Sequence, residues 1–127
     1  MNKTYKFGFE KLEVWQMARK LSIEVYKATK SFPSEEKYTL VSQIRRAAVS
    51  VASNIAEGSS RRSAKDQSHF TTMSFSSLME LISHLIIATD LEYLTEDVLD
   101  NFRASIQTLS VKLSNLKNAQ EKRIVNR

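Results

Sequence analysis

The sequence predicts an all-α protein that folds as an antiparallel up-down-up-down four-helix bundle, and three observations support this prediction. The chain has 127 residues with 42% hydrophobic content, enough for one domain with a core. It holds only 2 Gly and 1 Pro, so it lacks the residues that β-turns and hairpins require. Apolar residues recur at spacings of three and four along four segments, which is typical of amphipathic helices. Four helices with short links pack in alternating directions.

The first helix is expected to run from about Glu10 to Ser31. Pro33 then ends it, because proline has no backbone N–H to donate and its ring clashes with the preceding turn. The inward stripe of this helix alternates spacings of four and three residues, and it consists of Val14, Ala18, Leu21, Val25, Ala28 and Phe32.

The second helix is expected to run from Ser34 to about Glu57. Ser34 is suited to an N-cap, and the acidic residues 35 and 36 place negative charge at the positive end of the helix dipole. Gly58 sits where a left-handed C-terminal cap is favoured, so the helix is expected to end there. The inward stripe consists of Leu40 or Val41, Ile44, Ala48, Val51 and Ile55.

The third helix is expected to begin after Ser63 and to continue to about Tyr93. Ser63 with Asp66 three residues later resembles a capping box, with Asp in place of the usual Glu or Gln. The inward stripe consists of Phe70, Ser74, Ser77, Leu81, Leu85 and Ala88.

The fourth helix is expected directly after a very tight turn, because Thr95 provides a cap and residues 96 and 97 are acidic. Residues 1–9 are then an N-terminal arm, residues 10–119 the bundle, and residues 120–127 a charged, frayed C-terminal tail. The fourth stripe has the cleanest register, a narrow seam that implies left-handed supercoiling, and it consists of Leu99, Phe102, Ile106, Leu109, Leu113 and Leu116.

Composition limits the functional classes. The net charge is +5 and the pI about 9.6, which favours polyanionic partners, although such an excess also serves solubility. The chain has no Cys, which excludes disulfides and thiolate sites and fits a cytoplasmic location. The N-terminus lacks the apolar stretch of a secretory signal, and apolar runs elsewhere are too short to span a membrane, so no membrane association is expected.

Surplus apolar surface predicts a homo-oligomer. The second helix carries Val49, Ala52 and Ala56 to one side of its stripe, and small residues let another backbone approach closely. A bundle helix needs an apolar face of only about three positions in seven, and the third helix exceeds it. The alternative is a broad central helix whose two strips touch both neighbouring helices. The second strip of the third helix consists of Phe75, Met79, Ile82, Ile86 and Tyr93.

No catalytic or metal site is predicted, and no cofactor is expected. Glu80 and His84 share a helix face, but the Glu-x-x-His motif of di-iron bundles is absent, so a surface His–Glu pair is the favoured interpretation. His69 lies about four turns from His84, too far to share a ligand set with it. The glycines do not form a phosphate-binding loop. Trp15 and Tyr26 are expected to pack rather than to stack on bases.

Five cations around the second helix form the candidate nucleic-acid site. If an oligomer repeats them, phosphate contacts multiply and binding becomes sensitive to salt. The alternative is a solvated face, or ion pairs from the two cations within the helix to Glu57 or Asp66 of a neighbour. A polar strip along the same helix, from Gln43 to Glu57, fits a seam between subunits as well as it fits a ligand site. The five cations are Arg45, Arg46, Arg61, Arg62 and Lys65.

Three segments carry a family resemblance: FEKLEVWQMARKLSIEVYKATKSFP, QIRRAAVSVASNIAEGSSR and FTTMSFSSLMEL. They strongly resemble the four-helix-bundle proteins encoded by intervening sequences in bacterial 23S rRNA genes. The most specific part is Gln43 to Gly58, where the family pattern is close to QIRRAA-x-S-I-x-x-NIAEG. Ala52 stands where many members carry Pro, and Ser76 where many carry Gly. Both replacements are small, so they affect a kink or a close contact more than the fold.

The resemblance implies a homopentameric barrel with a basic surface. It also implies similarity to the accessory variability protein of diversity-generating retroelements, which works with a reverse transcriptase and binds nucleic acid. We therefore expect a non-enzymatic oligomeric module that binds RNA or DNA. The alternative is a protein-interaction scaffold for a polymerase or a ribosome-associated partner. No matched position is a known catalytic residue, and these positions are Gln43, Arg45, Arg46, Asn54, Glu57, Gly58 and Glu80.

Overall fold

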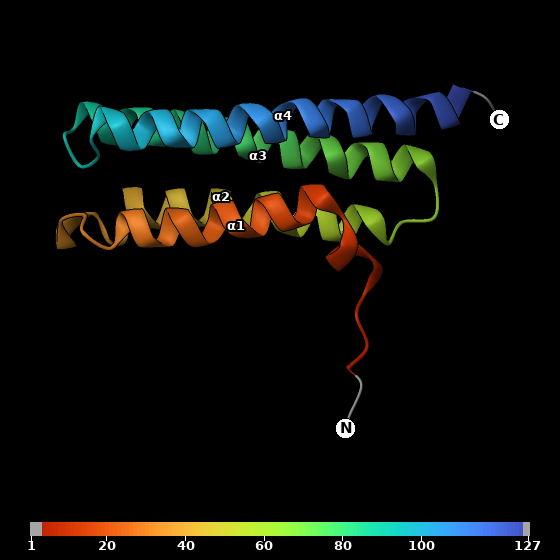
Figure 1. The fold of residues 1–127 in the computed structure, drawn as a ribbon, viewed down its shortest axis with the longest axis horizontal. Helices are drawn as coiled ribbons and strands as arrows, with labels where there is room; N and C mark the ends of the chain where they lie inside the picture. The colour runs from red at the N-terminus through yellow and green to blue at the C-terminus, as the bar shows by residue number, and fades with distance from the viewer. Residues whose placement is uncertain (1–3, 126–127) are drawn as a thin grey trace.

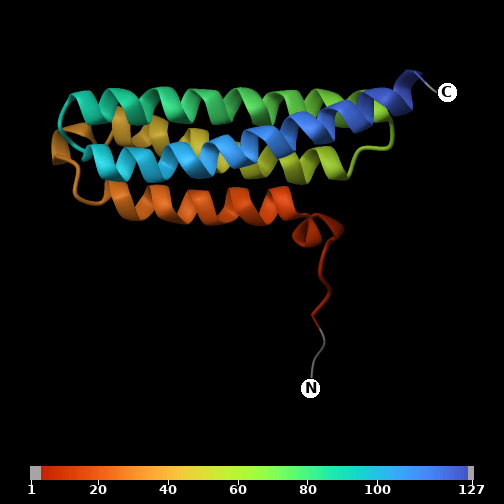
Figure 2. The ribbon, with the colours of Figure 1, turned by 45° about the horizontal axis from the view of Figure 1, so that its top comes forward.

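The computed structural model describes residues 4–125, which form four long helices in an elongated bundle (Figure 1). Successive helices run in opposite directions, so the N-terminal arm, the α2–α3 connection and the end of α4 lie at one end of the bundle (Figure 2). The all-α, up-down-up-down fold is confirmed. The helices are α1 (Glu13–Thr29), α2 (Leu40–Ser59), α3 (Ala64–Asp90) and α4 (Glu96–Val125), with short 3-10 helices η1 (Gly8–Lys11) and η2 (Ser34–Glu36) before α1 and α2.

A single hydrophobic core runs through the bundle. Every residue of the four predicted stripes is buried or partly buried, which follows from the three-four spacing of their side chains. Two fully buried residues lie outside those stripes, Ala47 on α2 and Leu78 on α3. They widen the apolar faces of the two helices that pack most closely together, because α3 contacts both α2 and α4.

The second helix begins later than predicted. Ser34 makes no side-chain cap, and residues 34–36 form the separate turn η2. The backbone of Thr39 is far from helical, with φ −119° and ψ −98°, so α2 starts only at Leu40. The carboxylate of Glu36 stabilises this break, because it accepts hydrogen bonds from Thr39 Oγ1 at 2.6 Å and from Tyr93 Oη at 2.9 Å.

The prediction that Gly58 is a left-handed cap is wrong. Gly58 lies within α2 and is buried, and among the described residues no glycine has a positive φ. The helix ends one residue later, and Ser60 caps it with φ −89°. The absence of a side chain at Gly58 serves packing, because a Cβ atom there would lie 2.8 Å from Cβ of Phe70 on α3.

The ends of α3 are set by side-chain and backbone caps. Ser63 Oγ accepts a hydrogen bond from the Asp66 N–H at 3.1 Å, which confirms the predicted N-cap. The helix ends at Asp90 rather than Tyr93, because Glu92 adopts a left-handed backbone with φ 66°. The Tyr93 N–H donates to the carbonyl oxygen of residue 88, and the Glu92 N–H to that of residue 89, which is the Schellman pattern.

The turn into α4 is as tight as predicted, and Thr95 Oγ1 accepts from the Val98 N–H at 3.2 Å. However, α4 continues to Val125, through most of the segment expected to be a frayed tail. Gln120 is buried and accepts a hydrogen bond from Thr71 Oγ1 at 2.8 Å, which holds the extension against α3. The outermost parts of the expected arm and tail, residues 1–3 and 126–127, lie outside the described residues.

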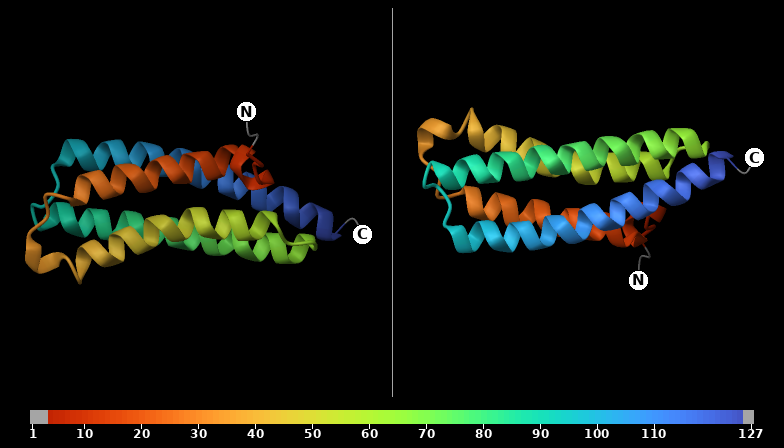
Figure 3. Two further views of the ribbon diagram at one scale, coloured as in Figure 1. Left: turned by 90° about the horizontal axis from the view of Figure 1, so that it is seen from below. Right: turned by 90° about the horizontal axis from the view of Figure 1, so that it is seen from above.

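Helix α4 crosses the bundle obliquely, so its C-terminal half approaches the α2–α3 connection (Figure 3). By length and composition α3 is also apolar enough to cross a membrane, with a mean hydropathy of 1.3 over its best window, 28% of which is buried. Core helices of soluble bundles pass the same test. The expectation of no membrane association therefore stays a prediction.

Candidate nucleic-acid interface

The structure separates the five candidate cations into two groups. Arg45 and Arg46 lie in the first two turns of α2, whereas Arg61, Arg62 and Lys65 lie beyond its far end. About 20 Å of helix separates the groups, at 1.5 Å per residue. One subunit therefore does not gather all five side chains into one patch.

Arg45 faces α1 and joins it to α2. Its Nε donates to Thr29 Oγ1 at 2.9 Å, and its Nη2 donates to the Tyr26 carbonyl oxygen at 3.3 Å. The guanidinium also lies 4.5 Å from the centre of the Tyr26 ring, a cation–π contact. Two of the five N–H donors of Arg45 are thus used within the chain.

Arg46 faces the opposite neighbour, α3. Its Nη2 lies 3.2 Å from Glu80 Oε2, and the same oxygen lies 3.3 Å from His84 Nε2. The His–Glu pair is confirmed, and Arg46 pairs with Glu80 of its own chain, while a pair with Glu57 or Asp66 of a neighbour stays a prediction. Among residues 4–125 no cluster of three or more His, Asp or Glu side chains is arranged to hold a metal ion.

The end of the bundle at the α2–α3 connection carries the remaining cations. Arg61, Arg62 and Lys65 are exposed, and the Arg61 guanidinium lies 4.6 Å from the centre of the Phe70 ring. Within the described part of the chain none of these three side chains lies within 4.0 Å of a carboxylate oxygen. Their charges are therefore available to an external anion.

Helix α4 adds Arg123 to this end, which sequence analysis placed in the tail. Arg123 Nη2 donates to Gln67 Oε1, and Gln67 Nε2 donates to the Arg61 carbonyl oxygen at 2.9 Å. The signal was present in the sequence, because Gln120 continues the spacing of Leu113 and Leu116. We call the set Arg61, Arg62, Lys65 and Arg123 the basic end.

The α3–α4 connection, at the opposite end of the bundle, is acidic. Residues 90–100, which contain the α3–α4 connection, hold five carboxylates and no Lys or Arg. The α1–α2 connection at the same end carries Lys30 and Lys37, so only the α3–α4 connection is acidic there. A polyanion is attracted to the basic end and repelled from the α3–α4 connection.

The middle of the polar strip of α2 is used within the chain. Ser50 Oγ lies 2.9 Å from Ser77 Oγ, and Asn54 Nδ2 donates to the Ser50 carbonyl oxygen at 3.0 Å. Ser74 is fully buried, and its Oγ donates to the carbonyl oxygen of Val51 at 2.8 Å. These short hydroxyl side chains form a satisfied seam between α2 and α3, so they are not free to bind a ligand.

The structure exposes two of the apolar residues predicted to form an oligomer interface and partly buries the others. Val49 and Met79 are exposed, by 42% and 38%. Tyr93 lies in the α3–α4 connection, with its ring 5.3 Å from that of Phe32. The broad-helix alternative thus describes part of the strip, and association through its exposed part stays a prediction. The remaining residues are partly buried, and these are Ala52, Ala56, Phe75, Ile82 and Ile86.

The chain is similar to known proteins both in sequence and in fold. The family model described as 23S rRNA-intervening sequence protein matches residues 10–115. A solved structure with a similar fold is a protein of unknown function from the S23 ribosomal protein family of Bacteroides thetaiotaomicron. It has a TM-score of 0.76 and 18% sequence identity, and the match covers 82% of this chain and 97% of that chain. No curated protein matches the sequence.

Proposed function

The chain belongs to the family of 23S rRNA-intervening sequence proteins, and from this premise we propose that it is a non-enzymatic, oligomeric module that binds RNA or DNA through its basic end. Neither the family description nor that of the similar structure names an enzymatic activity. The proposal concerns binding alone.

One observation carries the proposal: Arg61, Arg62 and Lys65 lie together without carboxylate partners among residues 4–125, and α4 places Arg123 beside them. Arginine presents planar donors that match phosphate oxygens, so three arginines favour a phosphate-bearing ligand. Arg45 and Arg46 have partners within the bundle, and we assign them to its stability.

Assembly strengthens this interaction. A single basic end offers four cations, which supports only weak phosphate binding at physiological salt. Copies associating through exposed residues such as Val49 and Met79 repeat the basic end and raise the avidity without a new contact. The resemblance to pentameric barrels makes a pentamer the expected assembly, and light scattering measures the subunit number.

The test is fluorescence anisotropy with a labelled RNA hairpin and a labelled 20-bp DNA duplex over a salt series. We expect log K to fall linearly with log salt. Removing three cations in Arg61→Ala/Arg62→Ala/Lys65→Ala lowers the salt slope for duplex DNA by about 2 to 3 units. Gel filtration of each variant confirms that the assembly is unchanged.

A matched control removes the same charge elsewhere. Lys20, Lys27 and Lys30 are exposed on or directly after α1, and Lys20→Ala/Lys27→Ala/Lys30→Ala keeps the basic end intact. This control retains most of the wild-type affinity if the basic end is the site. Equal losses in both triple variants, or wild-type binding that ignores salt, contradict the proposal.

A second candidate function is a protein-interaction scaffold. The exposed apolar residues Met79, Ile87 and Leu91 on one side of α3 and its exit favour it, because such patches bind proteins. Treatment with nuclease discriminates the two functions in a pull-down from the native host. Association through RNA or DNA is lost after nuclease treatment, whereas direct association with a protein survives it.

A further inference from the structure

The N-terminal arm carries an aromatic side chain at every second position, Tyr5, Phe7 and Phe9. The Tyr5 and Phe7 rings are 5.2 Å apart and nearly perpendicular, and the Phe7 and Phe9 rings are 6.2 Å apart and nearly parallel. Phe9 makes an edge contact of 5.0 Å with Trp15, which packs against the core. The rings therefore form a continuous ladder from the core of the bundle into solvent.

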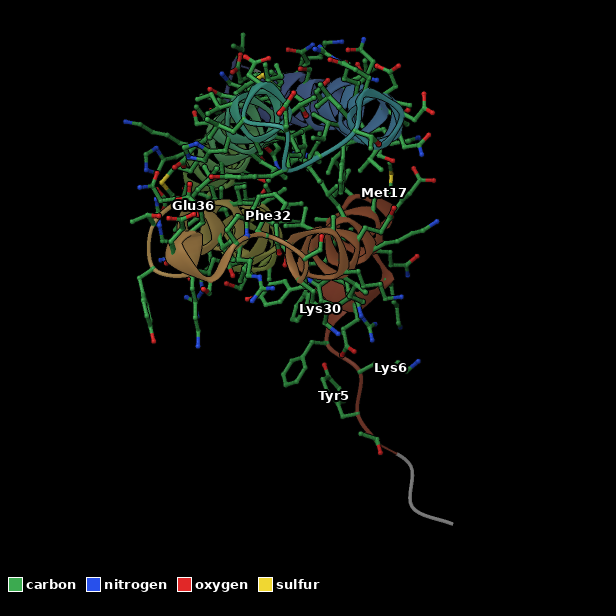
Figure 4. All side chains as sticks on the ribbon, turned by 90° about the vertical axis from the view of Figure 1, so that its left-hand side faces the viewer. Tyr5, Lys6, Met17, Lys30, Phe32 and Glu36 are labelled. Carbon is green, nitrogen blue, oxygen red and sulfur yellow. The ribbon has the colours of Figure 1, made fainter. Side chains whose placement is uncertain are left out.

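The two outer rings of the ladder are exposed to solvent. Tyr5 is 76% exposed and Phe7 is 59% exposed, and Figure 4 shows Tyr5 on the arm outside the packed helices. Phe7 is nevertheless held in place, because its N–H donates to Glu10 Oε2 at 2.7 Å and its carbonyl oxygen accepts from the Glu10 N–H at 3.1 Å. An ordered, exposed ring is preorganised for a ligand with a flat face.

Cations lie beside these rings, because Lys6 separates Tyr5 from Phe7 and Lys11 follows Phe9 by two residues. Lys6 and Lys11 are exposed, and the Arg19 guanidinium lies 5.5 Å from the centre of the Trp15 ring. Aromatic side chains with cations beside them suit a strand of unstacked bases joined by phosphates. They suit a second copy of this chain less well, because charged residues are depleted from the cores of protein interfaces.

The ladder also adjoins the basic end. Leu12, at the start of α1, lines a cavity of about 170 Å³ together with Gly58, Gln67 and Arg123. Gln67 is the residue that links Arg123 to Arg61. A nucleic-acid strand bound at the basic end therefore reaches the start of the arm without crossing the acidic α3–α4 connection.

We propose that the arm is a stacking site for single-stranded nucleic acid, in which bases stack on Tyr5 and Phe7 while Lys6 and Lys11 contact phosphates. This inference rests on the proposed function and narrows its ligand to strands with unpaired bases. Stacking is sequence-tolerant, because every base offers a π-face.

The experiment compares the full chain with the variant Tyr5→Ala/Phe7→Ala. The probes are a 12-nucleotide single strand containing 2-aminopurine and a duplex of the same length. Because base–aromatic stacking is worth about 1–3 kcal/mol per base, we expect the double variant to bind the single strand at least about tenfold more weakly. Its affinity for the duplex changes less than about twofold, because paired bases do not reach the rings.

Two further measurements sharpen the result. We expect the wild-type protein to quench the 2-aminopurine emission through stacking and the double variant not to quench it. The variant Tyr5→Phe/Phe7→Tyr keeps an aromatic ring at both positions and should show wild-type quenching and affinity. Unchanged single-strand affinity in the double variant overturns the stacking site but leaves the proposed function standing. Wild type that binds neither probe overturns both. A double variant with a smaller assembly mass and unchanged single-strand affinity shows that the arm contacts another subunit, which also overturns the inference.

Discussion

Gly58 on α2 and Phe70 on α3 pack so closely that a Cβ atom on Gly58 would lie 2.8 Å from Cβ of Phe70. The Phe70 Cβ is bonded directly to the backbone, so no change of rotamer moves it away. Relief of the contact requires the two helices to separate where the basic end begins. This glycine therefore couples the packing of α2 on α3 to the position of Arg61.

We expect Gly58→Ala to lower the free energy of unfolding by about 1–3 kcal/mol, the usual cost of overpacking. The result opposes helix propensity, which favours Ala over Gly by about 1 kcal/mol in a helix interior. Urea denaturation measures the change. Gly8→Ala is the control and should be nearly neutral, because nothing lies within 4 Å of a Cβ at Gly8. A more stable Gly58→Ala variant contradicts this account of the packing.

Gly58 also illustrates what could be predicted from the sequence and what could not. The inward stripes were predictable, because apolar residues recur along each helix with its period of 3.6 residues. The function of Gly58 depends on Phe70 of another helix, and spacing within one helix carries no information about such a contact. Arg123 was missed because the residue that continues the stripe, Gln120, is polar, and only its hydrogen bond with Thr71 of another helix shows that it faces inward.

The left-handed backbone of Glu92 provides a second prediction. A left-handed conformation costs a residue with a side chain about 1–2 kcal/mol, and a β-branched side chain suffers most. We expect Glu92→Val to be less stable than Glu92→Gly by about 1–2 kcal/mol, measured by thermal unfolding. Val and Gly substitutions at exposed Ser53, which lies in the interior of α2, show the opposite order of propensity. Equal stability of the two Glu92 variants would count against the Schellman geometry of this turn.

The Glu36 carboxylate gives a pH dependence. Hydrogen bonds from Thr39 Oγ1 and then from Tyr93 Oη lower the pKa of Glu36 below its ordinary value of 4.5. A lowered folded-state pKa contributes stability that is present above the unfolded-state pKa and is lost as pH falls through the folded-state pKa. We expect Thr39→Val and Tyr93→Phe to be destabilised at neutral pH, with the differences from wild type shrinking below about pH 4.5.

The hydrogen bond between Tyr93 and Glu36 also predicts a loss of stability at alkaline pH. The hydrogen bond to Glu36 raises the pKa of Tyr93 above its ordinary value of 10.0, because ionised Tyr93 loses its donor and faces a carboxylate. The stabilisation is therefore present below pH 10.0 and is lost as pH rises through the folded-state pKa of Tyr93. Urea midpoints measured across the pH range test both limits. A constant difference between wild type and Tyr93→Phe refutes the assignment.

Arg45 and Arg62 separate stability from binding. Arg45→Ala removes two hydrogen bonds and the cation–π contact with Tyr26, so we expect it to lower the free energy of unfolding by about 1–2 kcal/mol. Arg62→Ala removes the same charge from an exposed side chain that has no carboxylate partner in the described part of the chain, and it should leave stability unchanged.

The affinity for duplex DNA should fall more in Arg62→Ala than in Arg45→Ala. At a temperature where both variants are folded, Arg62→Ala weakens binding to duplex DNA and lowers the salt slope by about 0.9, whereas Arg45→Ala keeps the wild-type slope. Anisotropy titrations at several salt concentrations, together with circular dichroism melts, give both quantities for each variant. If Arg45→Ala lowers the slope and Arg62→Ala does not, phosphates bind near the start of α2, and the assignment of the basic end is wrong.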